Sequence, residues 1–422
     1  MRLRRGLQAA QERPRNRQHI CSVRILVPFC RSLPERSFYQ DFHQGVTDAL
    51  RELGHEPITS SFSAIGEATQ EDMQALYLQI ADGNIDALLD LCCWGYGLSQ
   101  FSIAGKNGEQ EPLFSRFDIP WTGMLFDHPY NQAIHAIRAR RLFATYPDLG
   151  HVAQARLVYP GLALNGEIFA PPAARPANDR SGPTGTDRTI DVLYIGNLEH
   201  RALERLWREE AAERGPGASE SGIRDAIADA ALAEPERSLH LSVRAAVERF
   251  DAIPPDSYFY NHLRVVEWHL RAKFRRDAVV ALARSGVRMR VVGSGWDAVD
   301  LPANVERTAQ TDYEGLFRLA GQARICLDAS TYLDGANDRV FSYALNGAVC
   351  FTNSAGYLQR QFGGGGMRFY SMRRLDELAE GVRELLARPA ELRAAGEAAR
   401  EKVLASHTWR HRLGDVLAAL RP

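Results

Sequence analysis

The sequence predicts an α/β protein made of two doubly wound, parallel-sheet domains in tandem. Two observations support this: near-continuous apolar runs alternate with amphipathic helical patterns in both halves, and the composition changes abruptly at residues 171–187. The length of 422 residues fits two or three domains of ordinary size. Hydrophobic residues make up 45% and charged residues 24% of the chain, the balance of an ordinary globular protein.

Four predicted strands lie in the first half, with helical patterns between them. The elements are, in order, a strand over 21–30, a helix over 36–54, a strand over 56–63, a helix over 71–83 and strands over 85–95 and 118–129. The first helix carries an apolar stripe of Phe38, Phe42, Val46 and Leu50 and ends at Gly54. Strands that are apolar on both faces are typical of a sheet covered by helices on both sides.

A linker is predicted at residues 171–187, where Pro, Gly, Ser and Asp replace the apolar periodicity. A second alternating unit follows. Its elements are a strand over 189–197, a helix-rich stretch over 201–275, a strand over 287–296, a helix over 313–323, a strand over 324–330, two helices over 375–407 and a last helix over 408–420. We therefore expect a tail at 1–19, a first domain at 20–170 and a second domain at 188–405 with a helical insertion at 201–275, followed by a terminal segment at 406–422.

Charge and cysteine usage limit the classes of function. The formal net charge of −1 argues against a bulk nucleic-acid binder, which would be basic over a whole domain. No apolar run approaches the 18 or so residues of a membrane span. The six cysteines form no C-x-x-C pair and lie mostly in apolar runs, so we expect free thiols, a cytoplasmic location and no zinc site. Cys92 and Cys93 are predicted to point to opposite faces of one strand.

The amino terminus is strongly basic, with six arginines against Glu12 alone in residues 1–18. It lacks the apolar core of a signal peptide. We expect a disordered tail or a start codon placed upstream of the true one. The functional alternative is peripheral contact with anionic lipid at the inner membrane face, or with nucleic acid.

A polar cluster opens a short predicted helix within residues 334–353. Asn337 or Asp338 can act as the N-cap, residues 340–345 form the helix, and Asn346-Gly347 ends it. Free N–H groups at such a helix start favour a phosphate, to which Arg339 can add a bidentate contact. Asp338 is an acceptor suited to ribose or sugar hydroxyls. The alternative is a capped core helix with a surface arginine.

Two glycine-containing turns follow predicted strands. Gly196 and Asn197 end the first strand of the second unit, and Gly293 and Gly295 follow a later strand. Ligands often lie at the carboxyl ends of strands in open α/β sheets. The second turn lacks the third glycine of a dinucleotide fingerprint, which disfavours an NAD-dependent dehydrogenase. Ordinary strand-to-helix turns remain the alternative.

A carboxylate and an imidazole end an apolar strand of the first unit. Asp127 and His128 could supply a general base, or they could form a polar turn before Pro129. The four glycines at 363–366 lack the flanking lysine of a phosphate-binding loop and are interpreted as a flexible loop. No D-x-D pair indicates a metal-dependent nucleotide site, so no metal and no cofactor are expected.

The second half resembles a known family. The segments "DVLYIGNLEHR", "VVGSGWD", "TDYEGLFRLAGQARICLDAS", "NDRVFSYALNGAVCFTN", "QFGGGGMRFY" and "SHTWRHRLGDVLAAL" occur in the order seen in CgeB-like (spore-maturation-protein-type) glycosyltransferases. The likeness covers about residues 188–422, apart from 201–260, and the first half only in outline. It implies the GT-B fold, in which two Rossmann-like domains face each other across a cleft.

The resemblance also implies a bacterial enzyme that acts on a cell-surface polysaccharide or another glycan, lipid-linked or protein acceptor. The second domain would hold a nucleotide-sugar donor, the first would hold the acceptor, and the last helix would cross back to the first domain. Asn337, Asp338 and Arg339 would lie at the donor phosphates and sugar. The nucleotide side would consist of Gly196, Asn197, Gly293, Gly295 and Trp296, with Tyr313 near the base.

One departure from the family pattern concerns the mechanism. Related retaining enzymes carry Glu-x7-Glu, whose second Glu binds the nucleotide ribose, whereas this chain has Asp334 and Ser342. The departure favours an inverting, metal-independent transfer that needs a base in the first domain, for which Asp127 and His128 are the candidates. It also keeps two alternatives open: a catalytically degenerate glycan- or partner-binding protein, and a non-hydrolysing nucleotide-sugar epimerase.

Overall fold

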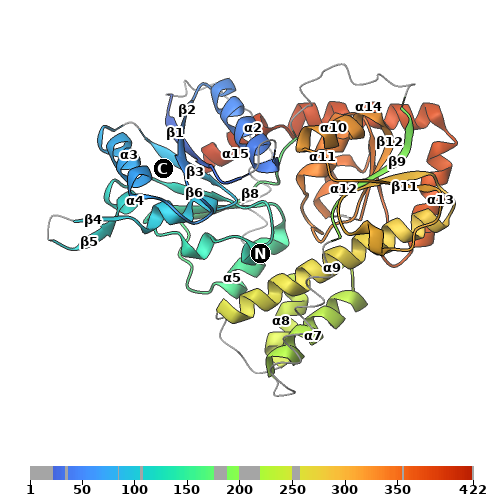
Figure 1. The fold of residues 1–422 in the computed structure, drawn as a ribbon, viewed down its shortest axis with the longest axis horizontal. Helices are drawn as coiled ribbons and strands as arrows, with labels where there is room; N and C mark the ends of the chain where they lie inside the picture. The colour runs from blue at the N-terminus through green and yellow to red at the C-terminus, as the bar shows by residue number, and fades with distance from the viewer. Residues whose placement is uncertain are drawn as a thin grey trace.

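Two six-stranded parallel sheets form the centres of two α/β domains, as the sequence predicts (Figure 1). The computed structural model describes residues 22–33, 37–83, 85–104, 108–174, 188–198, 219–249, 257–353 and 356–420. The predicted basic tail at 1–19, Cys21 and residues 175–187 of the predicted linker lie outside these ranges.

The sheet of the amino-terminal domain has the strand order β2-β1-β3-β6-β7-β8. Its strands are β1 (Arg24–Cys30), β2 (Glu56–Phe62), β3 (Ala87–Leu91), β6 (Trp121–Met124), β7 (Leu142–Tyr146) and β8 (Gly166–Phe169). A small antiparallel pair, β4 (Ser102–Ala104) and β5 (Gln110–Pro112), lies outside the sheet. The strand order reverses between β1 and β3, which is the place where open α/β sheets leave a crevice at their carboxyl edge.

Four described helices of this domain cover its sheet. They are α2 (Phe38–Glu52), α3 (Gln70–Ala81), α4 (Leu113–Arg116) and α5 (Leu149–Val158). Ser37 caps α2 by accepting from the Gln40 N–H, and Gly54 with φ +83° follows its end. Of the predicted stripe on α2, only Phe38 is exposed, at 40%.

The prediction for Cys92 and Cys93 was wrong. β3 ends at Leu91, and both cysteines follow in a left-handed turn, with φ of 58° and 55°. They therefore do not alternate across a strand. The described cysteines, Cys30, Cys92, Cys93, Cys326 and Cys350, are buried and free, as predicted.

The carboxy-terminal domain has the strand order β11-β10-β9-β12-β13-β14. Its strands are β9 (Ile190–Ile195), β10 (Met289–Val292), β11 (Val305–Thr308), β12 (Ala323–Asp328), β13 (Val349–Thr352) and β14 (Met367–Phe369). Successive residues alternate between two cores: Val192 and Tyr194 enter one, and Leu193 and Ile195 the other. The order reverses between β9 and β12, so a second crevice is expected at their carboxyl ends.

Seven helices lie within residues 257–420 of the described chain. They are α9 (Ser257–Arg284), α10 (Tyr313–Gln322), α11 (Asp338–Leu345), α12 (Gly356–Phe362), α13 (Leu375–Leu386), α14 (Pro389–Ser406) and α15 (Trp409–Ala419). Helix α11 is capped by Asn337 and ends at Asn346-Gly347, as predicted. No helix among the described residues combines the length and apolar character that a membrane span needs.

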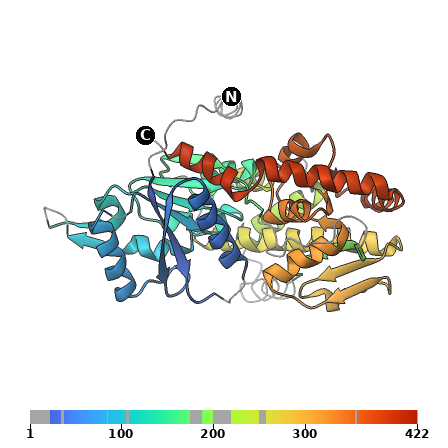
Figure 2. The same cartoon turned by 90° about the horizontal axis from the view of Figure 1, so that it is seen from above.

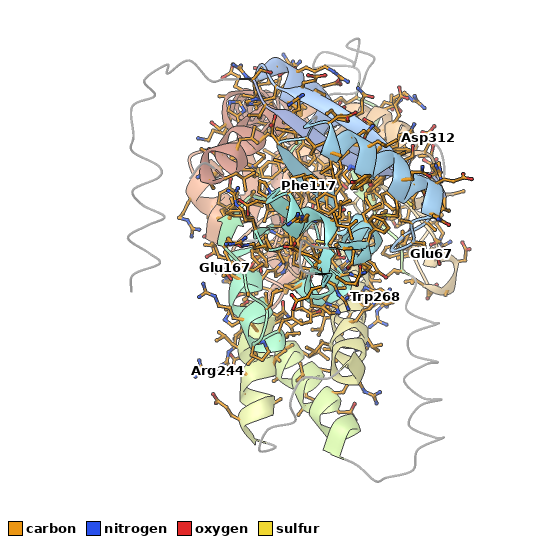
Figure 3. All side chains as sticks on the ribbon, turned by 90° about the vertical axis from the view of Figure 1, so that its left-hand side faces the viewer. Glu67, Phe117, Glu167, Arg244, Trp268 and Asp312 are labelled. Carbon is orange, nitrogen blue, oxygen red and sulfur yellow. The ribbon has the colours of Figure 1, made fainter. Side chains whose placement is uncertain are left out.

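The inserted helices α7 (Ser219–Ala233) and α8 (Leu239–Arg249) pack with the amino-terminal domain, although they follow β9 in sequence. They project below the two sheets in Figure 1, and Figure 3 shows Arg244 of α8 at this lower end. Helix α9 belongs to both domains. Leu263, Val266 and Leu270 lie in the amino-terminal core, whereas Ala278 and Leu282 lie in the carboxy-terminal core. It extends beyond residue 275, where the predicted insertion ended.

A second connection between the domains is α15, which crosses back to the amino-terminal domain as the resemblance implies. α14 and α15 follow one another along one side of the molecule (Figure 2). Trp409 of α15 packs against Phe42 and Phe126, with ring centroids 5.3 and 5.8 Å apart. Arg412 donates to the Pro171 carbonyl at 2.8 Å and to the ring of His407 at 2.7 Å, which ties α15 to the chain leaving the first domain.

Candidate functional site

Two adjoining cavities lie between the domains, at the carboxyl ends of β9, β10 and β12. The larger has a volume of about 520 Å³ and the smaller about 180 Å³. The amino-terminal domain contributes Ser37, Phe38, Phe42 and Phe126 to the larger cavity. Both cavities are lined by Phe126, Arg275, Asp338 and Arg339. These four residues therefore mark the junction.

The junction contains the start of α11. The Asn337 side chain accepts from the backbone N–H groups of Arg339 and Val340, at 3.0 and 3.4 Å, which is ordinary N-cap geometry. Its amide nitrogen donates to both oxygens of Asp328, at 3.1 and 3.2 Å. Asp328 ends β12 and is 1% exposed. The buried carboxylate thus fixes the cap that orients the helix start.

Arg339 is held across the gap between β9 and β12. Its Nη1 donates to the Ile195 carbonyl at 2.7 Å, and its Nη2 lies 3.4 Å from Asp328 Oδ1. Burial alone would lower the pKa of Arg339, but Asp328 and nearby groups raise it above its usual value. Arg339 is therefore a permanently charged group at the switch point of the sheet.

Arg275 differs from the other arginines of the cleft because it has no carboxylate partner among the described residues. Its Nη1 donates to the Asn197 carbonyl at 3.0 Å, and its buried Nε has no hydrogen-bond partner in the described structure. Burial lowers the pKa of Arg275, and the neighbouring Arg339 and Arg271 add to this effect, while Tyr194 and Asp328 oppose it. A buried guanidinium without a counter-ion is unfavourable unless an anion occupies the adjacent cavity.

Gly196, Asn197 and Gly293, three of the predicted donor-binding residues, line the larger cavity. Gly293 has φ +140°, and a Cβ atom there would lie 2.4 Å from the Gly196 carbonyl oxygen. The Asn197 side chain accepts from the Ser294 N–H at 3.0 Å and joins the two turns. A side chain at position 293 would force the ends of β9 and β10 apart.

Three predicted donor-binding residues line neither cavity. Trp296 is buried, and its indole N–H donates to the Gly196 carbonyl at 2.7 Å. Gly295 has φ +83°, and a Cβ there would lie 2.4 Å from the Leu198 carbonyl oxygen. Ser342 is 2% exposed, within α11. Trp296 and Gly295 therefore shape the turn behind the cavity, and Ser342 belongs to the core under α11.

Of three further groups considered in the sequence analysis, one lines the larger cavity and two line neither cavity. Tyr313 lines the larger cavity and donates its hydroxyl to Asp338 Oδ2. Asp334, the other half of the departure from Glu-x7-Glu, is paired with Arg360 at 2.7 Å and lines neither cavity. The four-glycine run lies between α12 and β14 and also lines neither.

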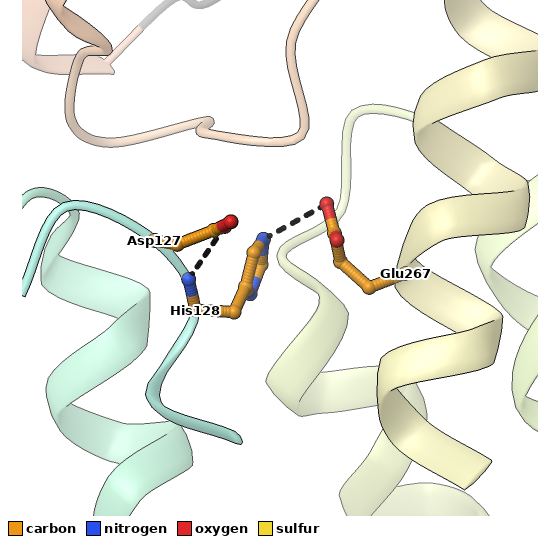
Figure 4. Close-up of side chains that lie close together, drawn as sticks. All are labelled: Asp127, His128 and Glu267. Atoms are coloured by element: carbon orange, nitrogen blue, oxygen red, sulfur yellow. Dashed lines mark hydrogen bonds and ion pairs between the residues drawn. The ribbon is translucent and has the colours of Figure 1, made fainter. Parts of the chain in front are cut away.

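Asp127 and His128, the predicted base candidates, are bound in a network across the domain boundary (Figure 4). Arg271 of α9 donates to Asp127 at 2.5 Å and to Glu267 at 2.7 Å. His128 is buried, with Nδ1 3.0 Å from the Gln154 side chain and Nε2 3.2 Å from the Thr331 hydroxyl. It lines neither cavity, so a substrate cannot reach its nitrogens in this arrangement.

The ion pair with Arg271 decides the protonation of Asp127. Burial alone would raise the pKa of Asp127, but Arg271 and His128 outweigh it and lower the pKa to about 2. Asp127, His128 and Glu267 lie close enough together to resemble a metal-ligand set. The Arg271 guanidinium already bridges the two carboxylates, so a metal ion would have to displace it.

The loop between β12 and α11 is attached to the amino-terminal domain. Tyr332 donates its hydroxyl to the Phe126 carbonyl and to Asp127, both at 3.1 Å. The Asp334 N–H donates to Asp148 at 2.8 Å, and the Ala336 N–H donates to the Pro147 carbonyl at 3.1 Å. The small cavity is therefore complete only while the domains are in contact.

Sequence reasoning missed the contribution of α9. Glu267, Arg271 and Arg275 recur every four residues and so share one face of a helix. This spacing is visible in the sequence and could have indicated a charged face directed toward the cleft. No comparable signal indicates Asp328 or Tyr332, which follow from the packing of β12 and its loop against the other domain.

The comparisons with known proteins concern the second half most directly. Residues 271–418 match a family model described as Glycosyl transferase-like. No curated protein matches the chain. The matched segment includes Arg271, Arg275, Asp338 and Arg339, so the arginines of the cleft lie within it.

Solved structures match nearly the whole chain. An alpha-glucosyltransferase in complex with UDP-glucose and DNA containing an abasic site is 10% identical, with a TM-score of 0.52 and coverage of 96% of this chain and 100% of that one. An alpha-glucosyltransferase in complex with UDP is 10% identical, with a TM-score of 0.50 and coverage of 94% and 99%. An alpha-glucosyltransferase in complex with UDP and a 13-mer DNA containing a HMU base is 11% identical, also with a TM-score of 0.50 and coverage of 94% and 99%.

At such low identity this likeness shows the fold alone, and it agrees with two facing parallel-sheet domains of the kind expected from the sequence. The chain therefore has the GT-B fold, and its residues 271–418 are glycosyl transferase-like in sequence.

Proposed function

We propose that the protein transfers a sugar from a nucleotide-diphosphate donor to an acceptor. The observation that carries this proposal is the unpaired guanidinium of Arg275 at the junction of the two cavities. A diphosphate at the junction would supply the missing negative charge. The diphosphate would also lie against the Arg339 guanidinium and the positive end of the α11 dipole.

The cavities suit the two ends of such a donor. The larger, at about 520 Å³, falls within the usual range of ligand pockets of about 300–1,000 Å³ and would take the nucleoside. The smaller, at about 180 Å³, would take the sugar, with hydroxyl partners on Ser330, Thr331 and Tyr332. The diphosphate between them would lie against the two arginines that both cavities share.

This arrangement supports a transfer that uses fixed protein charges. As the bond between the sugar and the diphosphate breaks, negative charge builds on the departing phosphate oxygen. Arg275, Arg339 and the positive end of the α11 dipole would stabilise that charge without having to reorganise. We propose a metal-independent transfer on this basis. We propose an inverting one because Asp334 and Ser342 stand where related retaining enzymes carry Glu-x7-Glu.

The acceptor class is proposed from the charge of the whole chain. Similar structures hold DNA together with UDP or UDP-glucose, which concerns those proteins. The net charge of −1 leads us to propose a glycan, lipid-linked or protein acceptor for this chain. A cytoplasmic location is proposed because the described cysteines are free.

A thermal-shift series tests donor binding. The protein is melted with UDP, GDP, CDP, dTDP and NAD, alongside Arg275→Gln and Arg339→Gln. A ligand at about 100 times its Kd stabilises the native state by about 2.7 kcal/mol, so one nucleoside diphosphate should raise the Tm clearly. Both variants should lose most of that response.

Arg276→Gln is the matched control, because Arg276 neighbours Arg275 on α9, pairs with Asp277 and lines neither cavity. It should respond to the nucleotide like the wild type. A wild type that responds to no nucleoside diphosphate, or to NAD alone, would overturn the proposal. Nucleotide binding without sugar release from any donor would favour the alternative of a nucleotide-sugar-binding protein without transferase activity.

A further inference from the structure

Oxygen atoms of the amino-terminal domain and of the loop between β12 and α11 line the small cavity. Asp127, Thr331 and Tyr332 contribute side chains to this cavity and not to the larger one. This inference rests on the proposed function, under which the small cavity holds the donor sugar. The hydroxyls that these three side chains can bind depend on where their own protons are directed.

One oxygen of Asp127 takes every hydrogen bond of this carboxylate. Oδ1 accepts from Arg271 Nη2 at 2.5 Å, from the Tyr332 hydroxyl at 3.1 Å and from the His128 N–H at 2.8 Å, the last of which is drawn in Figure 4. Oδ2 has no hydrogen-bond partner among the described residues, and it is not enclosed by protein. Because Asp127 lines the small cavity, Oδ2 is the oxygen that a ligand there can reach.

Asp127 stays ionised, so Oδ2 can only accept a hydrogen bond. Burial alone would raise the pKa of Asp127, but Arg271 and His128 lower it to about 2. At neutral pH the group therefore has no proton to donate. Such an oxygen binds a hydroxyl that donates to it, and it repels a fluorine atom or an ether oxygen in the same place.

The hydroxyl proton of Thr331 is committed to Glu267. Thr331 Oγ1 lies 2.8 Å from Glu267 Oε1, and the same carboxylate is paired with Arg271 at 2.7 Å. Since a paired carboxylate only accepts, Thr331 is the donor. His128 Nε2 lies 3.2 Å from Thr331 Oγ1 and must carry a proton to bond with it. One lone pair of Oγ1 is then left, and it too can only accept.

The hydroxyl proton of Tyr332 is committed in the same way. Its two partners, the Phe126 carbonyl and Asp127, are both acceptors and both lie at 3.1 Å. The proton therefore stays with the amino-terminal domain whichever partner it bonds. Asp127, Thr331 and Tyr332 thus present acceptors to the small cavity, although two of them are hydroxyl residues.

Donors dominate where the two cavities meet. Arg275 and Arg339 line both cavities. Arg271 lines the small one, but its Nε and Nη2 are already bonded to Glu267 and Asp127. Guanidinium donors suit phosphate oxygens, which only accept, whereas acceptors suit sugar hydroxyls, which can donate. The two kinds of group therefore suit the two ends of a sugar diphosphate.

We propose that Asp127 and Thr331 select the donor sugar by accepting hydrogen bonds from its free hydroxyls. The substrate class is a nucleotide-diphosphate sugar whose ring carries an unmodified hydroxyl at the positions that face these two oxygens. Sugars that are deoxygenated, methylated or acylated at those positions are excluded. Asp127 is a binding residue in this role, and Arg271 and Glu267 fix the direction of the two acceptors.

Asp127→Asn tests this role because it exchanges the free acceptor for a donor of the same shape. Three donors converge on the Oδ1 position, so the amide oxygen of the variant is held there. The amide nitrogen then takes the Oδ2 position and presents N–H groups to the cavity. A fluorine atom on the sugar, which accepts but cannot donate, is repelled by the wild type and tolerated by the variant.

The measurement is calorimetric binding of UDP, UDP-glucose and the monodeoxy and monodeoxyfluoro forms of UDP-glucose at C2, C3, C4 and C6. The galactose series, and the GDP-mannose, CDP-glucose or dTDP-glucose series, are used where the nucleotide screen selects them. Loss of a hydrogen bond to a charged group should weaken wild-type binding of one deoxy form by about 10- to 100-fold. The fluoro form at that position should bind more weakly still.

Asp127→Asn should reverse the order of these two forms, so that the fluoro form binds at least as tightly as the deoxy form. UDP alone should bind the variant at least as tightly as the wild type, because one negative charge has been removed. A purely structural role of Asp127 would weaken all of these ligands together. Asp118→Asn, an exposed change in the same domain that lines neither cavity, should leave the order unchanged.

Thr331→Val provides a second, independent variant, including for the case that Asp127→Asn does not fold. It keeps the shape of the side chain and removes the acceptor, so it should weaken binding of the parent sugar nucleotide by about 3- to 10-fold without affecting UDP. Thr331→Ser keeps the oxygen and should bind like the wild type. Thr308→Val on β11, which lines neither cavity, is the matched control.

Failure of this proposal and failure of the proposed function give different results. A wild type that binds neither a nucleoside diphosphate nor any of the sugar nucleotides overturns both. If the wild type binds them, three results overturn the selection by Asp127 and Thr331 alone. They are fluoro forms that bind as tightly as the parent at every position, an unchanged order of deoxy and fluoro forms in folded Asp127→Asn, and wild-type sugar binding by Thr331→Val.

Discussion

At the scale of single residues, the cleft contains three arginines with different partners. Arg271 is shared by Asp127 and Glu267, and Arg339 is held by Asp328 and the Ile195 carbonyl. Arg275 has a single carbonyl partner. The first two are therefore paired with carboxylates of the protein, whereas the third has no carboxylate within 4.0 Å in the described structure.

Asp90 illustrates the opposite situation, a buried carboxyl group whose neutral form is favoured. It lies on β3 with 0% exposure and accepts from the Gly95 N–H at 2.8 Å. Burial raises its pKa from 3.8 to about 7, although the Gly95 hydrogen bond opposes this. The folded protein therefore binds this proton more tightly than the unfolded chain does, and the stabilisation is lost as the pH rises toward 7.

Replacing Asp90 with Asn should remove this pH dependence. Asn keeps an oxygen for the Gly95 N–H and carries no charge, so Asp90→Asn should be more stable than the wild type at pH 8 by about 1–3 kcal/mol. The gain should shrink toward pH 4. Urea unfolding at both pH values measures it, and an equal effect of the substitution at both would contradict the assignment.

Much of the site could be predicted at this scale, and the failures have a common cause. Asn337, Asp338 and Arg339 were found because a cap, a helix and a glycine stop have local signatures. Trp296 and Ser342 were placed in the donor site by resemblance, but their side chains point into cores that only the packed sheet defines. A short stretch of sequence does not show which of its side chains the packed fold will bury.

At the scale of elements, α15 is fitted closely against α2. A Cβ atom at Gly45 of α2 would lie 2.5 Å from Cδ1 of Trp409. Trp409 is 4% exposed and lies against Phe42 and Phe126, two of the aromatic residues that line the larger cavity. The absence of a side chain at Gly45 thus allows the last helix to support the wall of the site.

A methyl group at this contact should destabilise the protein. Gly45→Ala should lower the free energy of unfolding by about 1–3 kcal/mol, because the indole is enclosed and has little room to move. Gly414→Ala is the matched control on α15, since nothing lies within 4 Å of its added Cβ. It should be neutral or stabilising by up to about 1 kcal/mol. Equal stability of the two variants in urea unfolding would refute the close fit.

The elements themselves were predicted better than their ends. Apolar runs and helical stripes predicted most strands and helices of both domains, because those patterns are local. β3 was extended too far, since the cysteines after Leu91 are apolar yet adopt a left-handed turn. The short strands β7, β8, β11 and β14 were missed, and they become strands through pairing with neighbours.

At the scale of the whole molecule, the two domains are connected twice outside the linker. α15 returns to the amino-terminal domain, and α9 enters both hydrophobic cores. Two separate sheets would ordinarily unfold independently if their interface were small and polar. Because α9 packs in both cores, unfolding of one core should destabilise the other.

We therefore expect one cooperative thermal transition that includes both domains. Leu270→Ala removes a side chain that is 2% exposed in one core, and Leu282→Ala one that is 0% exposed in the other. Each should destabilise by about 2–5 kcal/mol and lower the same transition in calorimetry. Leu404→Ala, at a site 48% exposed, should change little. Two transitions, each lowered by only one of the variants, would show that the domains unfold separately.

The double membership of α9 has a further consequence for how this chain can change in length. Each residue added to an α-helix turns everything beyond it by about 100°. With the present helix length, the apolar residues before Arg271 face one core and those after it face the other. Arg275 lines the cleft at the same time. A single insertion or deletion near Arg271 would rotate one half against the other, so that both cores could not be filled while Arg275 still faced the junction. The number of residues in α9 is therefore constrained as strictly as their identity, because it fixes how the helix faces each of the two domains.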